Sequence, residues 1–374
     1  MATPKLIQRS SELLANMYDE ESALFSYSTR LVKNTYVNDF SNSNSSLRYT
    51  INVLAGIQRV RKYELPWDSD SLLERFMQRN ALRVCNAGDL GLLLLVLSEA
   101  HHDLSTKHAF EIKSRTDDPN WMRKLNLQEI SWLLSGTVAY ARAVQLDSAR
   151  DLAARLYGYL RKEFFPGSYL LPRHDRSTIR GRFSSFGALV YYLMAVHAYG
   201  DAFGDPAALD SFRATAQRVI SLQGPRGEWP WFIDAKVGRV LDWYQIYSVH
   251  QDAMAMLFLL PAFDLGSATA ERSIELSYRW LFGENELQEP LITGEPFFIC
   301  RSIRRNESKE RQRRYLRSLA LTASRRNART AARPALTINK ECRSYHIGWI
   351  LYVWALRTDF REFTELRLLT EGTK

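Results

Sequence analysis

The sequence predicts an all-α protein whose helices pair into six hairpins and close into an α/α toroid, an (α/α)6 barrel-like ring. Helical segments follow one another along nearly all of the 374 residues, and no strand-rich region interrupts them. Hydrophobic residues form 46% of the chain, enough for a large core. Several helices begin with a polar residue on an otherwise apolar stripe, as expected where inner helices point into one central pit.

Apolar residues at helical spacing define the elements in chain order. The twelve expected helices span residues 4–32, 47–61, 69–80, 90–100, 127–144, 147–164, 183–199, 209–222, 246–260, 268–282, 310–322 and 346–356. Asp68 or Ser69 suits an N-cap, and Pro206 fits an early helical position. Residues 107–126 are polar and are expected to be irregular. Closure of six hairpins buries a face of each against its neighbours, so we expect one domain over 1–374.

The net charge of +9 is concentrated in one segment. Residues 301–333 hold twelve Lys/Arg and two Asp/Glu, a balance of +10, so the other residues sum to −1. We expect a basic, partly irregular insertion that is exposed and has few internal partners. It could meet an acidic partner or be a solvated face without one. Tyr315 is its only aromatic ring, so nucleic acid is not an expected partner.

Several classes of protein and site are not indicated. No apolar run approaches the ~20 residues of a membrane span, and no hydrophobic export signal is visible, so we expect a cytoplasmic protein. Cys85, Cys300 and Cys342 show neither a disulfide framework nor zinc spacing, although His346 lies four residues after Cys342. Phosphate-loop, dinucleotide and zinc-protease motifs are absent, so no cofactor or metal is expected.

The stretch 224–263 contains the most site-like residues. Its first part is a loop broken by glycine and proline, whose polar and aromatic residues are Trp229, Trp231, Asp234, Asp242 and Tyr244. Its second part is a helix with His250 on its buried stripe and Asp252 beside it. An imidazole there is either a catalytic group in a cleft or a hydrogen-bonded core residue.

Three expected inner helices begin with a polar residue at the same offset from their apolar stripe. These residues are Arg182, His250 and His346. We expect them to converge on one cavity. The alternative is that each is an ordinary helix-start residue that reaches water.

The helix pairs, the turn GEWPWF at 227–232 and the segment YSVHQDAMA at 247–255 resemble the α/α-toroid superfamily, including bacterial members with a YHIGW-type segment like that at 345–349. That superfamily includes six-hairpin glycosidases, uronyl hydrolases and sugar epimerases, and also terpenoid cyclases and protein prenyltransferases. The chain departs from the cyclases because it lacks a DxDD acid, and Asp117 and Asp118 do not complete a DDxxD metal motif.

For this fold, sugar chemistry requires two groups that exchange protons and aromatic platforms for the ring. We assign His250 as general base or acid, Asp242 as its partner facing it, Tyr247 as a donor to substrate, and Asp252 as the alternative carboxylate. The expected substrate-binding residues are Trp229, Trp231, Tyr244, Arg182, His174, Arg343 and His346. The tryptophans also fit loop packing, and the arginines also fit surface charges.

The resulting hypothesis is an enzyme acting on a carbohydrate or uronic-acid-containing glycan, as a hydrolase, lyase or epimerase, by acid/base catalysis in the pit. One alternative is a terpenoid-cyclase-like enzyme with an aromatic-lined pit. The other is a non-catalytic partner in polysaccharide assembly that docks through 301–333.

Overall fold

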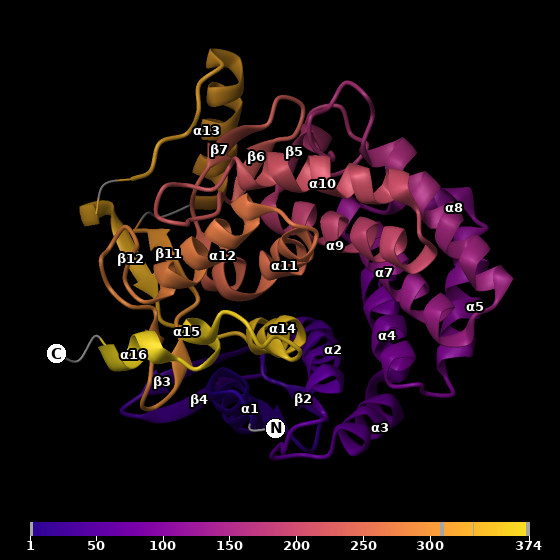
Figure 1. Cartoon of the computed structure of the whole chain (residues 1–374), viewed down its shortest axis with the longest axis horizontal. Coiled ribbons are helices and arrows are strands. Elements are labelled where there is room, and N and C mark those ends of the chain that lie inside the picture. Colours follow the sequence, from indigo (N-terminus) through magenta and orange to yellow (C-terminus); the bar gives the residue numbers. More distant parts are fainter. Residues whose placement is uncertain (1–2, 307–309, 332, 372–374) are drawn as a thin grey trace.

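A ring of six inner helices confirms the predicted α/α toroid (Figure 1). The computed structural model describes residues 3–306, 310–331 and 333–371. The inner helices are α2 (Ser43–Val60), α4 (Ala87–Glu99), α7 (Leu127–Val144), α9 (Phe186–Phe203), α11 (Met256–Asp264) and α14 (Ser344–Trp354). Each of the first four packs against the next. A π-helical turn, η3 (His250–Met254), leads into α11 and contacts α14, which packs on α2 and closes the ring.

Outer helices cover this ring. They are α1 (Lys5–Met17), α3 (Ser69–Asn80), α5 (Ser105–Thr116), α8 (Asp147–Phe164), α10 (Pro206–Ile220) and α12 (Ala268–Leu281). Shorter or peripheral helices are α6 (Pro119–Lys124), α13 (Glu310–Ser324), α15 (Arg361–Thr364) and α16 (Arg367–Glu371), with 3-10 turns at Ala81–Arg83, Arg180–Arg182 and Arg333–Ala335. Inner helices are buried nearly all round, whereas outer helices bury one stripe, as their sequences indicate.

Local sequence signals fix several helix boundaries. The bounds of α3, α7 and α8 are those predicted. The Asp68 carboxylate accepts hydrogen bonds from the first amides of α3. Asn126 and Glu129 form a reciprocal capping box at the start of α7. Asp205 caps α10, with Pro206 at the first helical position.

Two glycine pairs allow close seams between inner helices. A Cβ on Gly56 of α2 would lie 2.2 Å from the carbonyl oxygen of Gly348 in α14, and a Cβ on Gly348 would lie 2.7 Å from Val53 Cα. A Cβ on Gly136 of α7 would lie 2.1 Å from the carbonyl oxygen of Gly91 in α4. These distances are far below normal contact, so these two seams require glycine.

Short antiparallel strands precede several inner helices, and the sequence does not predict them. They are β1 (Tyr18–Asp19), β2 (Leu24–Phe25), β3 (Ser28–Val32), β4 (Thr35–Asp39), β5 (Phe183–Ser185), β6 (Phe232–Asp234), β7 (Arg239–Asp242), β8 (Ile246–Tyr247), β9 (Ile292–Thr293), β10 (Phe298–Ile299), β11 (Ser302–Arg305) and β12 (Leu336–Asn339). Strands β5, β6 and β7 form one sheet, and β12, β11 and β8 form another. These two sheets lie directly before α9, η3 and α14, so they position the first turns of three inner helices.

Three predicted segments differ from the structure. The helix expected over 246–260 is divided into strand β8, the π-helical turn η3 and α11, because Ile246 and Tyr247 pair with β11. The helix expected over 4–32 ends at Met17, because Asp19 accepts hydrogen bonds from Ser22 in a turn and Ala23 has a φ of 56°. Residues expected to be irregular over 107–126 form α5 and α6 instead. Asp118 caps α6 in front of Pro119, a start signal that the sparse apolar pattern obscured.

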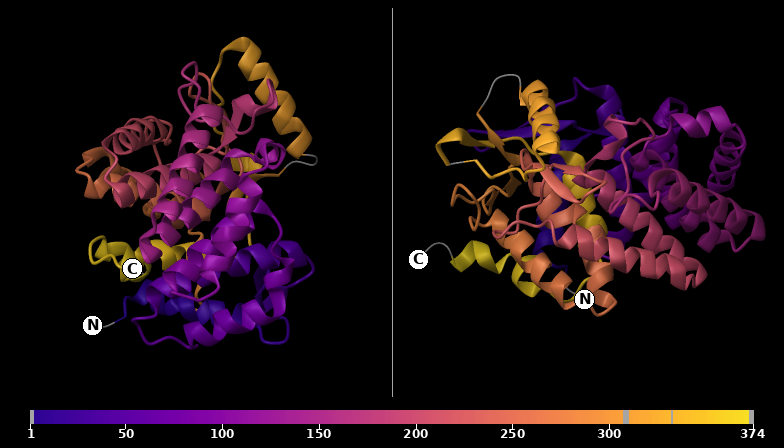
Figure 2. Two further views of the ribbon diagram at one scale, coloured as in Figure 1. Left: turned by 90° about the vertical axis from the view of Figure 1, so that its right-hand side faces the viewer. Right: turned by 90° about the horizontal axis from the view of Figure 1, so that it is seen from above.

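The basic segment is more ordered than predicted. Residues 302–305 form β11, and α13 packs on β7, standing beyond the ring (Figure 2). Arg305 and Arg314 have side chains only 10% and 16% exposed, and both bind Asp242. The expectation of an exposed segment with few internal partners is therefore wrong for these residues. None of the helices in the described part of the chain combines the length and apolarity needed to span a bilayer.

Candidate active site

The π-helical turn before α11 and the first turn of α14 meet at a buried hydrogen bond between an imidazole and a carboxyl group. His346, in the first turn of α14, places Nε2 2.6 Å from Oδ1 of Asp252 in η3. The backbone carbonyl of Asp252 also accepts a 2.7 Å hydrogen bond from Trp354 Nε1. Asp252 Oδ2 is buried and has no hydrogen-bond partner among the described residues. Burial raises the pKa of the Asp252 carboxyl, and the charge and hydrogen bond of His346 oppose that rise.

His250 lies beside this pair in an aromatic box formed by Phe186, Trp231 and Tyr247. The ring centroid of His250 is 4.9 Å from that of Phe186 and 5.2 Å from that of Tyr247. The Trp231 ring is nearly parallel to the imidazole, at 5.9 Å. Burial, followed by the charge of His346, lowers the pKa of His250 to about 3. The imidazole of His250 is therefore neutral at physiological pH.

An arginine cluster around Glu341 lies next to the aromatic box. Arg30, Arg301 and Arg343 all reach the Glu341 carboxylate, at 2.9, 3.3 and 2.8 Å respectively. Burial of Glu341 would raise its pKa, but the hydrogen bond from Arg30 and the charges of Arg343 and Arg301 prevail and lower it to about 2. The Arg301 guanidinium also stacks 5.3 Å from the centroid of Tyr247, which joins this cluster to the box.

A row of tyrosines continues from the arginine cluster. The Arg343 guanidinium lies 3.7 Å from the Tyr27 ring centroid. Tyr27 stacks on Tyr49 of α2 at 5.6 Å, and Tyr49 contacts Tyr345 of α14 at 4.5 Å. Stacked aromatic rings beside guanidinium groups suit the apolar faces and hydroxyl edges of a sugar.

Asp242 does not face His250, contrary to our prediction. Its carboxylate accepts a 2.7 Å hydrogen bond from Arg305 and a 3.2 Å hydrogen bond from Arg314. Arg317 is also within 3.8 Å of it. Asp242 ends β7, where its carboxylate, which is 1% exposed, turns toward Arg305 of β11 and Arg314 and Arg317 of α13. It anchors α13 to the sheet.

Four other predicted residues occupy separate positions. Trp229 is fully buried and donates Nε1 to Ser277, and Tyr244 is buried beneath Arg305, so both pack the loop. Arg182 binds Asp234 through two nitrogens. His174 lies in the loop before β5, where burial and the charge of Arg180 lower its pKa to about 4. Of the three helix-start residues, the described contacts bring together His250 and His346 only.

The sequence did not single out several residues of this site. Tyr27, Tyr49 and Tyr345 come from the first and last hairpins, and Arg301 and Phe186 flank strands that were not predicted. Only Phe186 and Tyr345 carry a sequence signal, which is a position within the first turn of an inner helix. Among the described side chains, no group of three or more His, Cys, Asp or Glu residues is arranged to hold a metal ion.

No protein-family model matches the sequence, and no curated protein matches it significantly. Solved structures share its fold. A sugar epimerase from a ruminal bacterium has a TM-score of 0.63 at 10% identity, covering 93% of this chain and 96% of that chain. The α-1,6-mannanase of Salegentibacter sp. HEL1_6 has a TM-score of 0.57 at 12% identity, covering 97% and 99%. The cellobiose 2-epimerase of Bacillus thermoamylovorans has a TM-score of 0.58 at 9% identity, covering 92% and 95%. At such identities the similarity establishes the α/α-toroid fold alone.

Proposed function

We propose that this chain is an enzyme that moves protons on a carbohydrate, with His346 and His250 as its acid/base groups. The observation that carries this proposal is the 2.6 Å contact between His346 Nε2 and Asp252 Oδ1 inside the helical ring. A carboxylate that holds one nitrogen of an imidazole fixes its orientation and stabilises its charged form. Nδ1 of His346 is then the nitrogen that faces substrate.

The carboxyl groups at this site do not suit hydrolysis by two carboxyls. That reaction requires one protonated carboxyl to act as the general acid. The pKa of Glu341 is lowered to about 2, so it carries no proton near neutrality. Burial raises the pKa of Asp252, but the charge and hydrogen bond of His346 at its Oδ1 oppose that rise. The imidazole of His346 is then the group that exchanges the proton, with the neutral His250 beside it, which favours epimerisation or elimination next to a carbonyl or carboxylate group over hydrolysis.

Aromatic rings and guanidinium groups support a sugar as the substrate. Trp231 and Tyr247 are half-buried and meet at 5.0 Å at the edge of the aromatic box, where the Arg314 guanidinium lies 5.5 Å from the Trp231 ring centroid. Arg301 and Arg343 supply donors for hydroxyl or carboxylate oxygens. Two of the solved structures with this fold are sugar epimerases, which adds support. A terpenoid substrate fits less well, because the sequence lacks the acid and metal motifs of those cyclases.

The test is to incubate the purified protein in D2O with a panel of reducing sugars and uronic-acid oligosaccharides. NMR would follow deuterium entering at the carbon beside the carbonyl or carboxylate, and a reducing-end assay would follow hydrolysis. We expect deuterium incorporation that is lost in His346→Gln. Hydrolysis retained in His346→Gln would contradict the proposal. Binding without any turnover would favour the non-catalytic alternative.

A further inference from the structure

A strongly basic cavity lies between the β6–β7 turn and the carboxyl end of α13. Its volume is about 590 Å³, within the range of about 300–1,000 Å³ that small-molecule sites occupy. It is lined by Arg182, Lys236, Val237, Arg239, Thr322, Ala323 and Arg325, and none of these is acidic. We call this the anion cavity.

The cations of the anion cavity are not neutralised from within the described structure. Asp234 is fully buried and binds Arg182, so the charges of these two residues cancel. Lys236, Arg239 and Arg325 make no ion pair in the part of the chain that the structure describes. The carboxyl end of α13 contributes only about half an elementary negative charge, near one wall. Three like charges facing one hollow repel each other, and an anionic ligand would relieve that repulsion.

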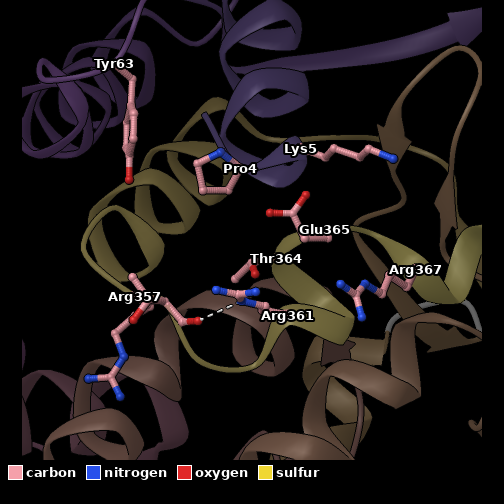
Figure 3. Close-up of a pocket in the computed structure, with 9 residues that line it drawn as sticks. Pro4, Lys5, Tyr63, Arg357, Arg361, Thr364, Glu365 and Arg367 are labelled. Atoms are coloured by element: carbon pink, nitrogen blue, oxygen red, sulfur yellow. Dashed lines mark hydrogen bonds between the residues drawn. The ribbon is translucent and has the colours of Figure 1, made fainter. Parts of the chain in front are cut away.

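In a second basic cavity of this chain, carboxylates neutralise part of the positive charge. It has a volume of about 340 Å³ and lies between the start of α1 and the C-terminal helices (Figure 3). There Arg357 binds both Asp264 and Asp359, and Glu365 forms part of the lining. The anion cavity has no comparable acid in its lining.

The anion cavity is joined to the candidate active site by one layer of side chains. Leu321 precedes Thr322 and packs against Phe183, Phe232 and Leu241, and Trp231 packs on the same cluster. Trp231 is also a wall of the aromatic box around His250. A polymer seated on Trp231 would therefore have the anion cavity beside it.

We propose that the anion cavity is a subsite for an acidic group, a carboxylate or a sulfate, on a polysaccharide that extends from the candidate active site. This inference rests on the proposed function, because it takes the substrate to be a glycan, and it narrows the substrate to an acidic one. Guanidinium groups bind carboxylate and sulfate oxygens through paired hydrogen bonds, and the ammonium of Lys236 adds a point charge.

The experiment measures binding by the full chain with Lys236, Arg239 and Arg325 all replaced by Gln. The probes are a galacturonate oligomer, its methyl ester, a sulfated dextran oligomer and a single-stranded RNA of equal length. The control variant replaces Lys107, Lys124 and Arg272 by Gln, which removes the same charge from exposed sites outside both basic cavities. Melting temperatures confirm that both variants fold.

We expect the cavity variant to bind the galacturonate or the sulfated oligomer at least about tenfold more weakly than the wild type at physiological salt, where screening acts over about 8 Å. The oligomer whose binding weakens in the cavity variant shows whether the ligand group is a carboxylate or a sulfate. The methyl ester should bind both variants equally. Equal weakening in the control variant, or weakening of RNA alone, would overturn the proposal. Because the readout is binding, it stays interpretable if His346→Gln shows that the chemistry is misassigned.

Discussion

Asp252 pairs with His346 across 2.6 Å, although His250 lies only two residues before Asp252 in the chain. Residues two apart in a helical turn point to different sides, so Asp252 and His250 project away from each other in η3. The pairing joins η3 to the first turn of α14, and the two residues are 94 positions apart in sequence. The carboxyl group of Asp252 therefore binds His346. His250 stays neutral because it is buried in the aromatic box.

His250 should make the fold sensitive to acid. Burial lowers its pKa to about 3 in the folded state, against about 6.5 in the unfolded chain. The unfolded chain therefore binds a proton that the folded chain excludes. The stabilisation is complete above about pH 6.5 and is lost as the pH falls toward 3, by about 2 kcal/mol between pH 7 and pH 5. Denaturant unfolding of the wild type and of His250→Gln at pH 7 and pH 5 tests this. The free energy of unfolding lost between the two pH values should be smaller by about 2 kcal/mol in His250→Gln. An identical pH dependence in the two proteins would contradict burial of a neutral imidazole.

The seam between α2 and α14 should not tolerate a side chain at Gly348. An added Cβ would meet Val53 Cα at 2.7 Å, so Gly348→Ala should lower the free energy of unfolding by about 1–3 kcal/mol or more through overpacking. Gly158 is the matched control, because it lies in α8 with open space where its Cβ would be. Gly158→Ala should stabilise by about 0.5–1 kcal/mol. Thermal melts of both variants provide the comparison, and a neutral Gly348→Ala would mean that the ring is less tightly closed.

Removing the charge of Asp242 should release α13 and leave the chemistry intact. Asp242→Asn takes the carboxylate from Arg305 and Arg314, whose side chains are 10% and 16% exposed. Breaking a buried pair in this way costs about 3–5 kcal/mol. We expect a lower melting temperature and faster trypsin cleavage within 310–324, with an unchanged kcat per folded molecule and a higher KM, because Arg314 leaves the Trp231 ring. Lost turnover in a protein with unchanged melting and cleavage would instead restore Asp242 as a catalytic group.

Arg301 should contribute to substrate binding more than to the chemical step. It contacts both the Tyr247 ring and Glu341 at the edge of the aromatic box. Arg301→Met should raise KM by about tenfold, the equivalent of one hydrogen bond to a charged group, with a smaller effect on kcat. Arg304→Met serves as the control, since Arg304 is exposed. Equal KM values for the two variants would remove Arg301 from the site.

The architecture could be predicted from the sequence because helical periodicity and caps act locally. The bounds of α7 and α8 follow from such signals, including the capping box of Asn126 and Glu129. The strands could not be predicted, because segments of two to five residues such as β8 are specified by partners far along the chain. Partners far along the chain also determine which residues meet at the candidate active site. The positions of His250 and His346 in first turns indicated a meeting point, but the choice of Asp252 over Asp242 depends on the cations of α13, which no local pattern reveals.

The most direct test of the central claim is a double-variant cycle on His346 and Asp252. When two residues act as one catalytic unit, replacing either one removes the contribution of both. Replacing the second residue then has little further effect on the rate. With the sugar identified in the D2O screen, kcat should fall by about 10²–10⁴-fold in His346→Gln. It should also fall substantially in Asp252→Asn, and the double variant should be no slower than His346→Gln. Independent, multiplying losses, or a kcat unchanged in either single variant, would contradict the account.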